Sequence, residues 1–106
     1  MAQFDVHLNQ GASRARFPYL LCVQSGMLRR LKRRVVIPLA PPPDGGEVPD
    51  PMLNPVLSVE GGRFLLSTQD ITNIPVEALG PVVANLRHDA EPIIGAIDWM
   101  LNQGYG

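Results

Sequence analysis

The sequence predicts a small, mainly β domain of the α+β class, in which an antiparallel sheet or partial barrel is closed by one C-terminal helix. Three observations lead to this prediction. Short stretches with the apolar pattern of strands recur as far as residue 84, paired glycines mark a hairpin turn, and helical spacing of apolar side chains begins only after Asp89. Because 106 residues suffice for one hydrophobic core, we expect a single domain over 1–106.

The first strand is expected over 3–8, where polar and apolar residues alternate with the period of a half-buried strand. The side chains of the apolar side, expected to face the core, are Phe4, Val6 and Leu8. Those of the other side, expected to face solvent, are Gln3, Asp5 and His7. A second strand over 19–24 is a continuous apolar run, typical of burial on both faces. Cys22 lies in this run, and a buried, unreactive thiol is the favoured interpretation.

A third strand and a long loop follow. Residues 35–39 are β-branched enough for a short strand, and Pro38 is expected at its end or on a sheet edge because proline donates no backbone hydrogen bond. The segment 40–52 holds five prolines and two glycines with little to bury. We therefore expect a long mobile loop there.

The remaining strands are expected in the second half of the chain. Residues 56–59 and 64–68 flank Glu-Gly-Gly-Arg, in which glycine allows the positive φ of a tight hairpin turn. Residues 74–80 form either a short strand or one helical turn that ends at a glycine, and 82–84 provide the last strand.

The only convincing helix is expected from Asp89 to Asn102. Asp89 can cap its first turn, and Pro92 is tolerated because first-turn amides lack partners within the helix. Gly104 is its natural terminator.

One side of this helix is apolar and the other carries the single tryptophan. At about 100° per residue five apolar side chains share the side expected to face the core. They are Ile93, Ile94, Ile97, Met100 and Leu101. Trp99 projects away from this stripe, beside Asp98 and Asn102. Three alternatives remain: the ring packs on the sheet or in a subunit interface, it anchors a partner protein, or it is incidentally exposed.

Charge and hydropathy exclude several classes of partner. A net charge of -1 provides no global field for nucleic acid or an acidic membrane. No apolar run approaches the roughly 20 residues of a membrane span, so we expect a cytoplasmic protein without membrane contact. The run 29–34 holds five of the nine Lys and Arg residues. It is a solvated connection, a docking surface for an acidic protein segment or, least favoured, a phosphate contact.

No arrangement of residues points to catalysis. His7 and His88 lie at opposite ends of the chain, and neither belongs to a spacing typical of zinc ligands. No nucleophile with a base, carboxylate pair or phosphate-binding loop is evident. We therefore expect a protein without enzymatic activity, catalytic residues, cofactor or metal, which acts by binding other proteins through its helix end.

Several motifs, taken in order, resemble one protein family. The sharpest are Val-Gln-Ser at 23–25 and, after the basic connection, Arg-Arg-Val-Val-Ile-Pro-Leu-Ala at 33–40. The further matching segments are 3–6, 54–56, 68–70, 74–76, 86–88 and 96–98. Over nearly the whole chain their order and spacing resemble the CcdB toxins of bacterial toxin–antitoxin modules. The resemblance implies a homodimer with an SH3-like barrel: a five-stranded antiparallel sheet, a small accessory sheet and a C-terminal helix, related to the MazF-like toxins.

The resemblance also implies an activity. CcdB toxins bind the A subunit of DNA gyrase, a topoisomerase, and trap the cleaved gyrase–DNA complex. The cell is arrested or killed until a partly disordered antitoxin, CcdA, displaces the toxin. We therefore expect a bacterial gyrase inhibitor that has no enzymatic activity, does not bind nucleic acid directly and is neutralised by a CcdA-like antitoxin.

The C-terminus departs from the family pattern. Family members that poison gyrase end in Trp-Gly-Ile, whereas here the motif tryptophan aligns with Asn102 and four residues follow. Either Trp99 or Tyr105 supplies the missing ring, or the gyrase contact has been lost or changed. The alternative functions are accordingly a diverged homologue with another protein target, or a MazF-like endoribonuclease.

The resemblance and the helix faces together give the expected contact residues. Met27 and Leu28 match the family's apolar pair after Val-Gln-Ser. The residues expected to contact the target are Asp98, Trp99, Asn102, Gln103, Gly104, Tyr105, Met27 and Leu28. Those expected to contact the antitoxin are Arg29, Arg30, Arg33 and Arg34.

Overall fold

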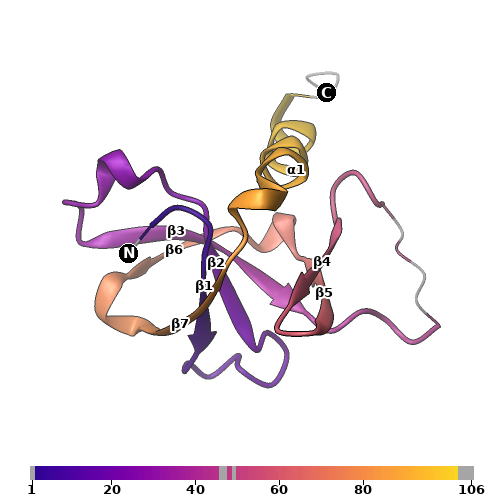
Figure 1. Ribbon diagram of the computed structural model, residues 1–106, viewed down its shortest axis with the longest axis horizontal. Helices are drawn as coiled ribbons and strands as arrows, with labels where there is room; N and C mark the ends of the chain where they lie inside the picture. The colour runs from indigo at the N-terminus through magenta and orange to yellow at the C-terminus, as the bar shows by residue number, and fades with distance from the viewer. Residues whose placement is uncertain (1, 46–47, 49, 103–106) are drawn as a thin grey trace.

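The computed structural model describes residues 2–45, 48 and 50–102, which form mainly antiparallel strands and one C-terminal helix (Figure 1). This α+β, mainly β architecture confirms the predicted fold class. The strands are β1 (Asp5–Asn9), β2 (Tyr19–Cys22), β3 (Arg33–Ala40), β4 (Val56–Val59), β5 (Gly62–Leu66), β6 (Thr72–Pro75) and β7 (Leu79–Asn85). The helix α1 spans Ala90–Asn102, and the 3-10 turns are η1 (Gly26–Leu28), η2 (Thr68–Asp70), η3 (Val76–Ala78) and η4 (Arg87–Asp89).

The strands curl into a half-barrel in which β3 has a central place. Along the sheet the order is β7, β1, β2, β3, and β3 then pairs with two strands on its far side. Its residues 33–36 pair with β6, whereas its residues 39–40 pair with β5. All seven strands belong to one sheet, in which β7, β1, β2, β3 and β6 form the five-stranded part that the resemblance implied. The hairpin β4–β5 is joined to it through β3 and is not a separate accessory sheet.

The expectation that Pro38 ends a short strand was wrong. β3 is eight residues long, and Pro38 lies inside it where the partner changes from β6 to β5. The Pro38 carbonyl accepts a hydrogen bond of 2.9 Å from the Ser67 amide on that side. Because the N and O atoms of one strand residue point the same way, the proline nitrogen faces the gap between the two partners, where no N–H is needed.

Both sides of β1 are covered, which corrects the expected alternation. Val6 is buried in the core, as expected, but Asp5 and His7 are also buried, whereas Leu8 is 37% exposed. Nδ1 of His7 lies 2.8 Å from the carbonyl oxygen of Gly80 in β7. The pairing of β1 with β7 contains register shifts on both sides of His7. Such irregularities bend the sheet. Side chains that the alternation within one strand places toward solvent can then be buried.

The predicted hairpin is confirmed, but its second strand spans Gly62–Leu66 and not 64–68, because Gly62 and Arg63 pair with β4. Its turn consists of Glu60 and Gly61, whose φ angles of 49° and 81° identify a two-residue turn of type I′. The segment 74–80 contains both predicted alternatives, a strand and a helical turn, one after the other. β6 ends at Pro75, the turn η3 follows, and β7 begins at Leu79, earlier than expected.

The helix α1 covers the core but buries a narrower stripe than expected. Ile93 and Ala96 are buried, whereas Ile94 and Leu101 are 45% and 65% exposed, so their assignment to the core face was wrong. A single helix lying on a curved sheet contacts it along a line, and residues at the edges of a wide stripe remain uncovered. The largest fully buried side chains are Leu21, Ile37, Leu39, Leu66 and Ile93. Nowhere in the described chain is a helix both long and apolar enough to cross a membrane.

Candidate functional site

The exposed side of α1 presents the tryptophan that the sequence singles out. Trp99 is 37% exposed and does not belong to the core cluster. One turn further on, Nδ2 of Asn102 donates a hydrogen bond to Oδ1 of Asp98. These two polar groups and the ring form a small surface of three residues, which we call the helix patch. The structure therefore supports the predicted outward direction of Trp99.

The chemistry of the helix patch suits protein recognition. An indole ring combines a large apolar face with one N–H donor, and such rings dominate the energetics of many interfaces. The described residues contain no group of three or more His, Cys, Asp or Glu side chains that could hold a metal ion. The patch thus offers contact area and hydrogen bonds to a partner.

A second exposed apolar pair lies on η1. The Ser25 Oγ caps this turn by accepting a 3.2 Å hydrogen bond from the Met27 amide. The short turn has no apolar face to bury, so Met27 is 87% and Leu28 50% exposed. Met27 has the highest exposed fraction of the exposed large apolar side chains among the described residues. Such side chains mark a candidate contact surface.

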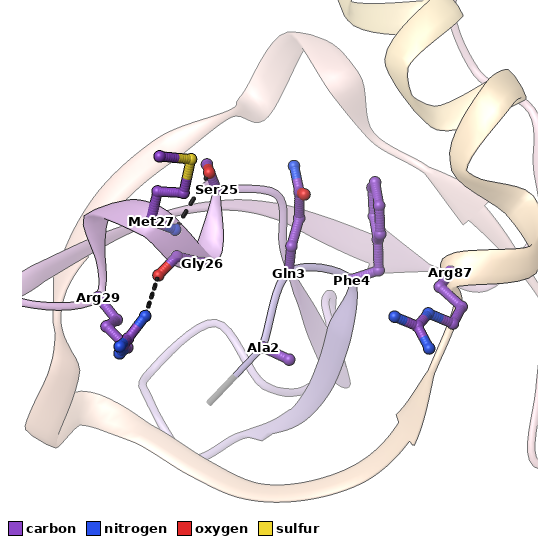
Figure 2. A pocket seen from close by; sticks show the side chains of 8 residues that line it. All are labelled: Ala2, Gln3, Phe4, Ser25, Gly26, Met27, Arg29 and Arg87. Carbon is purple, nitrogen blue, oxygen red and sulfur yellow. Dashed lines mark hydrogen bonds between the residues drawn. The ribbon is translucent and has the colours of Figure 1, made fainter.

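A groove lies beside η1, and we call it the N-terminal groove (Figure 2). Its volume is about 690 Å³. Its lining residues are Ala2, Gln3, Phe4, Ser25, Gly26, Met27, Arg29 and Arg87. They come from the N-terminal segment, from the loop that carries η1, and from η4, so the pairing of β1 with its two neighbours brings them together.

Phe4 lies in the groove wall with a backbone conformation that bulky residues rarely adopt. Its φ is 70°. The Phe4 amide donates to the Cys22 carbonyl at 2.7 Å, and the Phe4 carbonyl accepts from the Leu86 amide at 2.9 Å. These bonds to two different segments hold the unusual conformation in place, and residues of this kind gather at functional sites.

Two arginines line the groove, and none of its described lining residues is acidic. Arg29 and Arg87 lie on opposite sides of the Ala2–Phe4 segment in Figure 2. The nearby Asp5 carboxylate is occupied elsewhere, since it accepts from the Ala2 amide at 2.7 Å and from Nδ2 of Asn85 at 2.9 Å. The groove therefore carries an excess of positive charge.

The basic residues after η1 divide into two kinds. The Arg34 side chain is buried, and its guanidinium donates to the carbonyl oxygens of Leu31, Arg33 and Arg29. Those bonds fold the connection 29–33 back on β3, so Arg34 holds this connection together and is not available to a partner in this conformation. The basic side chains that remain exposed are Arg29, Arg30, Lys32 and Arg33.

Arg33 already has a partner within the chain. Its Nε donates to Oδ1 of Asn73 at 2.7 Å, and its Nη2 donates to the Asn73 carbonyl at 2.8 Å. Among the described residues the only close contact between a basic side chain and a carboxylate joins His88 and Asp89, with Nε2 and Oδ2 3.3 Å apart. None of the exposed arginines after η1 is therefore neutralised by a carboxylate of the described chain.

The Cys22 thiol is placed for packing. It is buried, and this burial raises the pKa of the Cys22 thiol, although the backbone at Gln24 and the charge of Arg34 partly oppose the rise. A raised pKa keeps the thiol protonated near neutral pH, and only the thiolate is a good nucleophile.

The structure brings some predicted site residues together and leaves others apart. Met27 and Arg29 share the N-terminal groove, whereas Trp99 belongs to the separate helix patch. Of the predicted target contacts, Gln103, Gly104 and Tyr105 lie outside the described residues. The same is true of the terminator role expected for Gly104.

Six groove residues were not predicted as a site from the sequence. They are Ala2, Gln3, Phe4, Ser25, Gly26 and Arg87. Gln3 and Phe4 were assigned to the first strand, and no sequence pattern indicated that Phe4 has a positive φ. Arg87 is separated from them by more than eighty positions, so only the pairing of β1 with β7 reveals the proximity.

One comparison with known proteins covers the segments that form these two surfaces. The family model described as CcdB protein matches residues 3–104 of the chain. The match includes the helix patch and, apart from Ala2, the whole N-terminal groove.

Proposed function

The chain belongs to the CcdB family of toxins from toxin–antitoxin modules, and from this premise we propose that it binds the A subunit of DNA gyrase and traps the cleaved gyrase–DNA complex. The observation that carries the proposal is the exposed Trp99 in the helix patch. An aromatic anchor of this kind contributes roughly 2 kcal/mol or more to an interface. Met27 and Leu28 provide further apolar contact area for the same target.

Because the C-terminus departs from the family pattern, the tryptophan ring lies at a different position of the helix. Asn102 stands where the Trp-Gly-Ile tail of gyrase-poisoning members begins, and Trp99 lies three residues earlier. Residues three apart on a helix are neighbours on its surface. We therefore assign the stacking contact to Trp99, with Asp98 and Asn102 as its polar rim.

A CcdA-like antitoxin completes the proposed cycle. The basic surface formed by Arg29, Arg30 and Arg33 attracts an acidic protein segment, and its occupation neutralises the toxin in the bacterial cytoplasm. The protein acts without catalysis or cofactor, as a homodimer. The exposed Ile94 and Leu101 support this dimer, since they lie a heptad apart on one side of α1.

Accumulation of cleaved DNA tests the proposal. Purified gyrase and plasmid DNA are incubated with the protein, and covalent gyrase–DNA complexes are trapped with detergent. We expect linear DNA to accumulate with the wild type and much less with Trp99→Ala, at equal folded content by circular dichroism. Growth arrest without cleaved complexes would instead identify a diverged member with another target. Degradation of purified messenger RNA by the protein alone would identify an endoribonuclease of the MazF type.

A further inference from the structure

A second cavity, of about 340 Å³, lies on the face of the sheet opposite the core cluster, and we call it the sheet pocket. Its apolar lining consists of Phe17, Leu20, Pro38, Ile74 and Ala78. Leu20 and Pro38 lie opposite each other in β2 and β3, and successive side chains of a strand point to opposite faces. This pair therefore faces away from Leu21 and Ile37, which belong to the core under α1. The sheet pocket shares no lining residue with the N-terminal groove or the helix patch.

One carboxylate lies in the wall of the sheet pocket. Oδ2 of Asp70 accepts a hydrogen bond of 2.6 Å from the Ser67 hydroxyl. None of the described lining residues is a lysine, an arginine or a histidine, and within the described chain only the Asp89 carboxylate lies close to a basic side chain. The charge of Asp70 is therefore not balanced within this part of the chain. A negative charge beside apolar walls favours a cationic occupant.

The side-chain amide in the lining has no N–H left for a ligand. Nδ2 of Asn9 donates to the Ser13 hydroxyl at 3.0 Å and to the Phe17 carbonyl at 2.8 Å, so both of its protons are used. Oδ1 of Asn9 accepts from the Gly11 amide at 2.9 Å. An anionic ligand would find only the hydroxyls of Ser13 and Thr72 as side-chain donors in the described lining.

A buried histidine beside the sheet pocket also lacks a donor. His7 is opposite Leu20 in the pairing of β1 with β2, so the two side chains share one face of the sheet. The Gly80 carbonyl oxygen, 2.8 Å from Nδ1 of His7, can only accept, so Nδ1 carries the proton and Nε2 of the neutral ring is an acceptor. This Nε2 is buried and has no hydrogen-bond partner among the described residues. An acceptor in this place again favours an occupant that donates hydrogen bonds.

The aromatic wall of the sheet pocket attracts positive charge. The guanidinium carbon of Arg16 lies 4.7 Å from the centre of the Phe17 ring. The same ring lines the sheet pocket together with Asp70. An aromatic ring near a carboxylate is a combination that recognises organic cations.

We propose that the sheet pocket binds a small organic ammonium compound, whose charged nitrogen pairs with Asp70 and whose apolar body lies against Phe17 and Leu20. The pocket volume is near the lower end of the range of ligand pockets, about 300–1,000 Å³, so a single ring with a short amine chain fits better than a peptide segment. The inference does not depend on the proposed function, because the sheet pocket lies apart from the helix patch.

Titration of the full-length protein with phenylethylammonium tests the proposal. The matched compounds are phenylethanol, which lacks the charge, phenylpropanoate, which reverses it, and ethylammonium, which lacks the ring. Binding is measured by calorimetry and mapped by amide chemical shifts. We expect saturable binding of phenylethylammonium, affinities about tenfold or more weaker for the three matched compounds, and shifts confined to residues 9–20, 70–74 and 78.

Two variants and a matched control sharpen the test. Asp70→Asn removes the charge but keeps an acceptor for Ser67, so it should weaken phenylethylammonium about tenfold. Asp44→Asn makes the same change at an exposed residue outside the sheet pocket and should leave the affinity unchanged. Ala78→Leu enlarges an exposed side chain of the lining, so it should block binding while circular dichroism stays unchanged.

Several results would overturn the proposal. They are the absence of saturable binding, shifts that map outside the sheet pocket, equal binding of phenylethanol, and equal weakening by Asp44→Asn. Tighter binding of a blocked lysine peptide would assign the pocket to a protein segment instead. Shifts of the same amides on dilution of the protein alone would assign it to a second copy of the chain. Failure of this proposal leaves the proposed function untouched, because ammonium binding and gyrase cleavage are separate readouts.

Discussion

Among single residues, Arg34 stabilises the connection that precedes β3. Its guanidinium is buried and donates to the carbonyls of Arg29 and Leu31 in that connection and of Arg33, the first residue of β3. Replacement by alanine leaves those carbonyls without a donor in a partly buried place. Because hydrogen bonds from a charged donor contribute about 1.5–3 kcal/mol, we expect Arg34→Ala to lower the free energy of unfolding by about 2 kcal/mol.

The control for Arg34 is a neighbouring arginine. Arg30 is exposed, and its replacement by alanine should change the free energy of unfolding by less than about 0.5 kcal/mol. Urea denaturation followed by fluorescence measures both variants. Equal midpoints for Arg34→Ala and the wild type would show that the buried guanidinium does not stabilise the connection.

The Cys22 thiol gives a pH-dependent prediction. Burial raises the pKa of the Cys22 thiol, so at neutral pH the folded protein contains less thiolate than an unfolded chain. Ellman's reagent should therefore react slowly with the native protein and rapidly in guanidinium chloride. The native rate should rise only as the pH increases above the range of an ordinary cysteine, about 8.5. Fast reaction of the native protein at pH 7 would contradict the assignment.

At the scale of elements, replacement of a glycine by alanine should lower the stability at Gly80 in β7 and raise it at Gly95 in α1. A Cβ at Gly80 would overlap the carbonyl oxygen of Leu8 in β1, so Gly80→Ala forces strands β1 and β7 apart. Such overpacking costs about 1–3 kcal/mol. A Cβ at Gly95 meets nothing within 4 Å, and alanine is favoured over glycine in a helix by about 1 kcal/mol.

Thermal unfolding distinguishes these two substitutions. Gly80→Ala should lower the melting temperature, and Gly95→Ala should raise it by several degrees, since about 1 kcal/mol corresponds to roughly 4–8 °C in a domain of this size. Stabilisation by Gly80→Ala would show that β1 and β7 are not as close as the structure has them.

The type of each element was easier to predict from the sequence than the strands with which it pairs. The hairpin β4–β5 and the helix α1 follow from local signals, namely paired glycines and apolar spacing. The length of β3 did not follow, because Pro38 is tolerated only where two different partner strands meet. The burial of His7 did not follow either, since it depends on how β7 folds against β1. Such errors arise where long-range pairing overrides the local pattern.

At the scale of the whole molecule, two surfaces of α1 separate two kinds of contact. Ile94 and Leu101 are exposed on one side of the helix, and the Trp99 ring lies on another. At about 100° per residue Trp99 lies well away from that apolar edge, whereas Asp98 of the helix patch borders it. A homodimer formed through Ile94 and Leu101 would therefore leave the Trp99 ring free for a target.

Sedimentation velocity tests this arrangement. We expect the wild type to sediment as a dimer and the double variant Ile94→Glu, Leu101→Glu as a monomer, because two buried unpaired carboxylates oppose association. Met52→Glu places the same charge at an apolar residue that is 57% exposed and lies outside the helix, and it should remain dimeric. If the double variant sediments like the wild type, the dimer lies elsewhere or does not form.

The candidate site was predictable in part. The outward direction of Trp99 follows from helical spacing, whereas Met27 and Leu28, which are exposed on η1, were expected as contacts only from the family resemblance. The N-terminal groove was not predictable, because Phe4 and Arg87 become neighbours only through the closure of the sheet. Helix faces are local properties, whereas a groove between segments is a property of the tertiary fold.

The affinity of the purified gyrase A subunit for this protein tests the central claim most directly. Trp99→Ala should weaken binding about thirtyfold, which corresponds to a loss of about 2 kcal/mol, while circular dichroism and sedimentation stay unchanged. Leu8→Ala removes an apolar side chain with the same exposed fraction of 37% and should bind like the wild type. Equal affinities of Trp99→Ala and the wild type, or no binding by the wild type, would contradict the assignment of the helix patch as the gyrase contact.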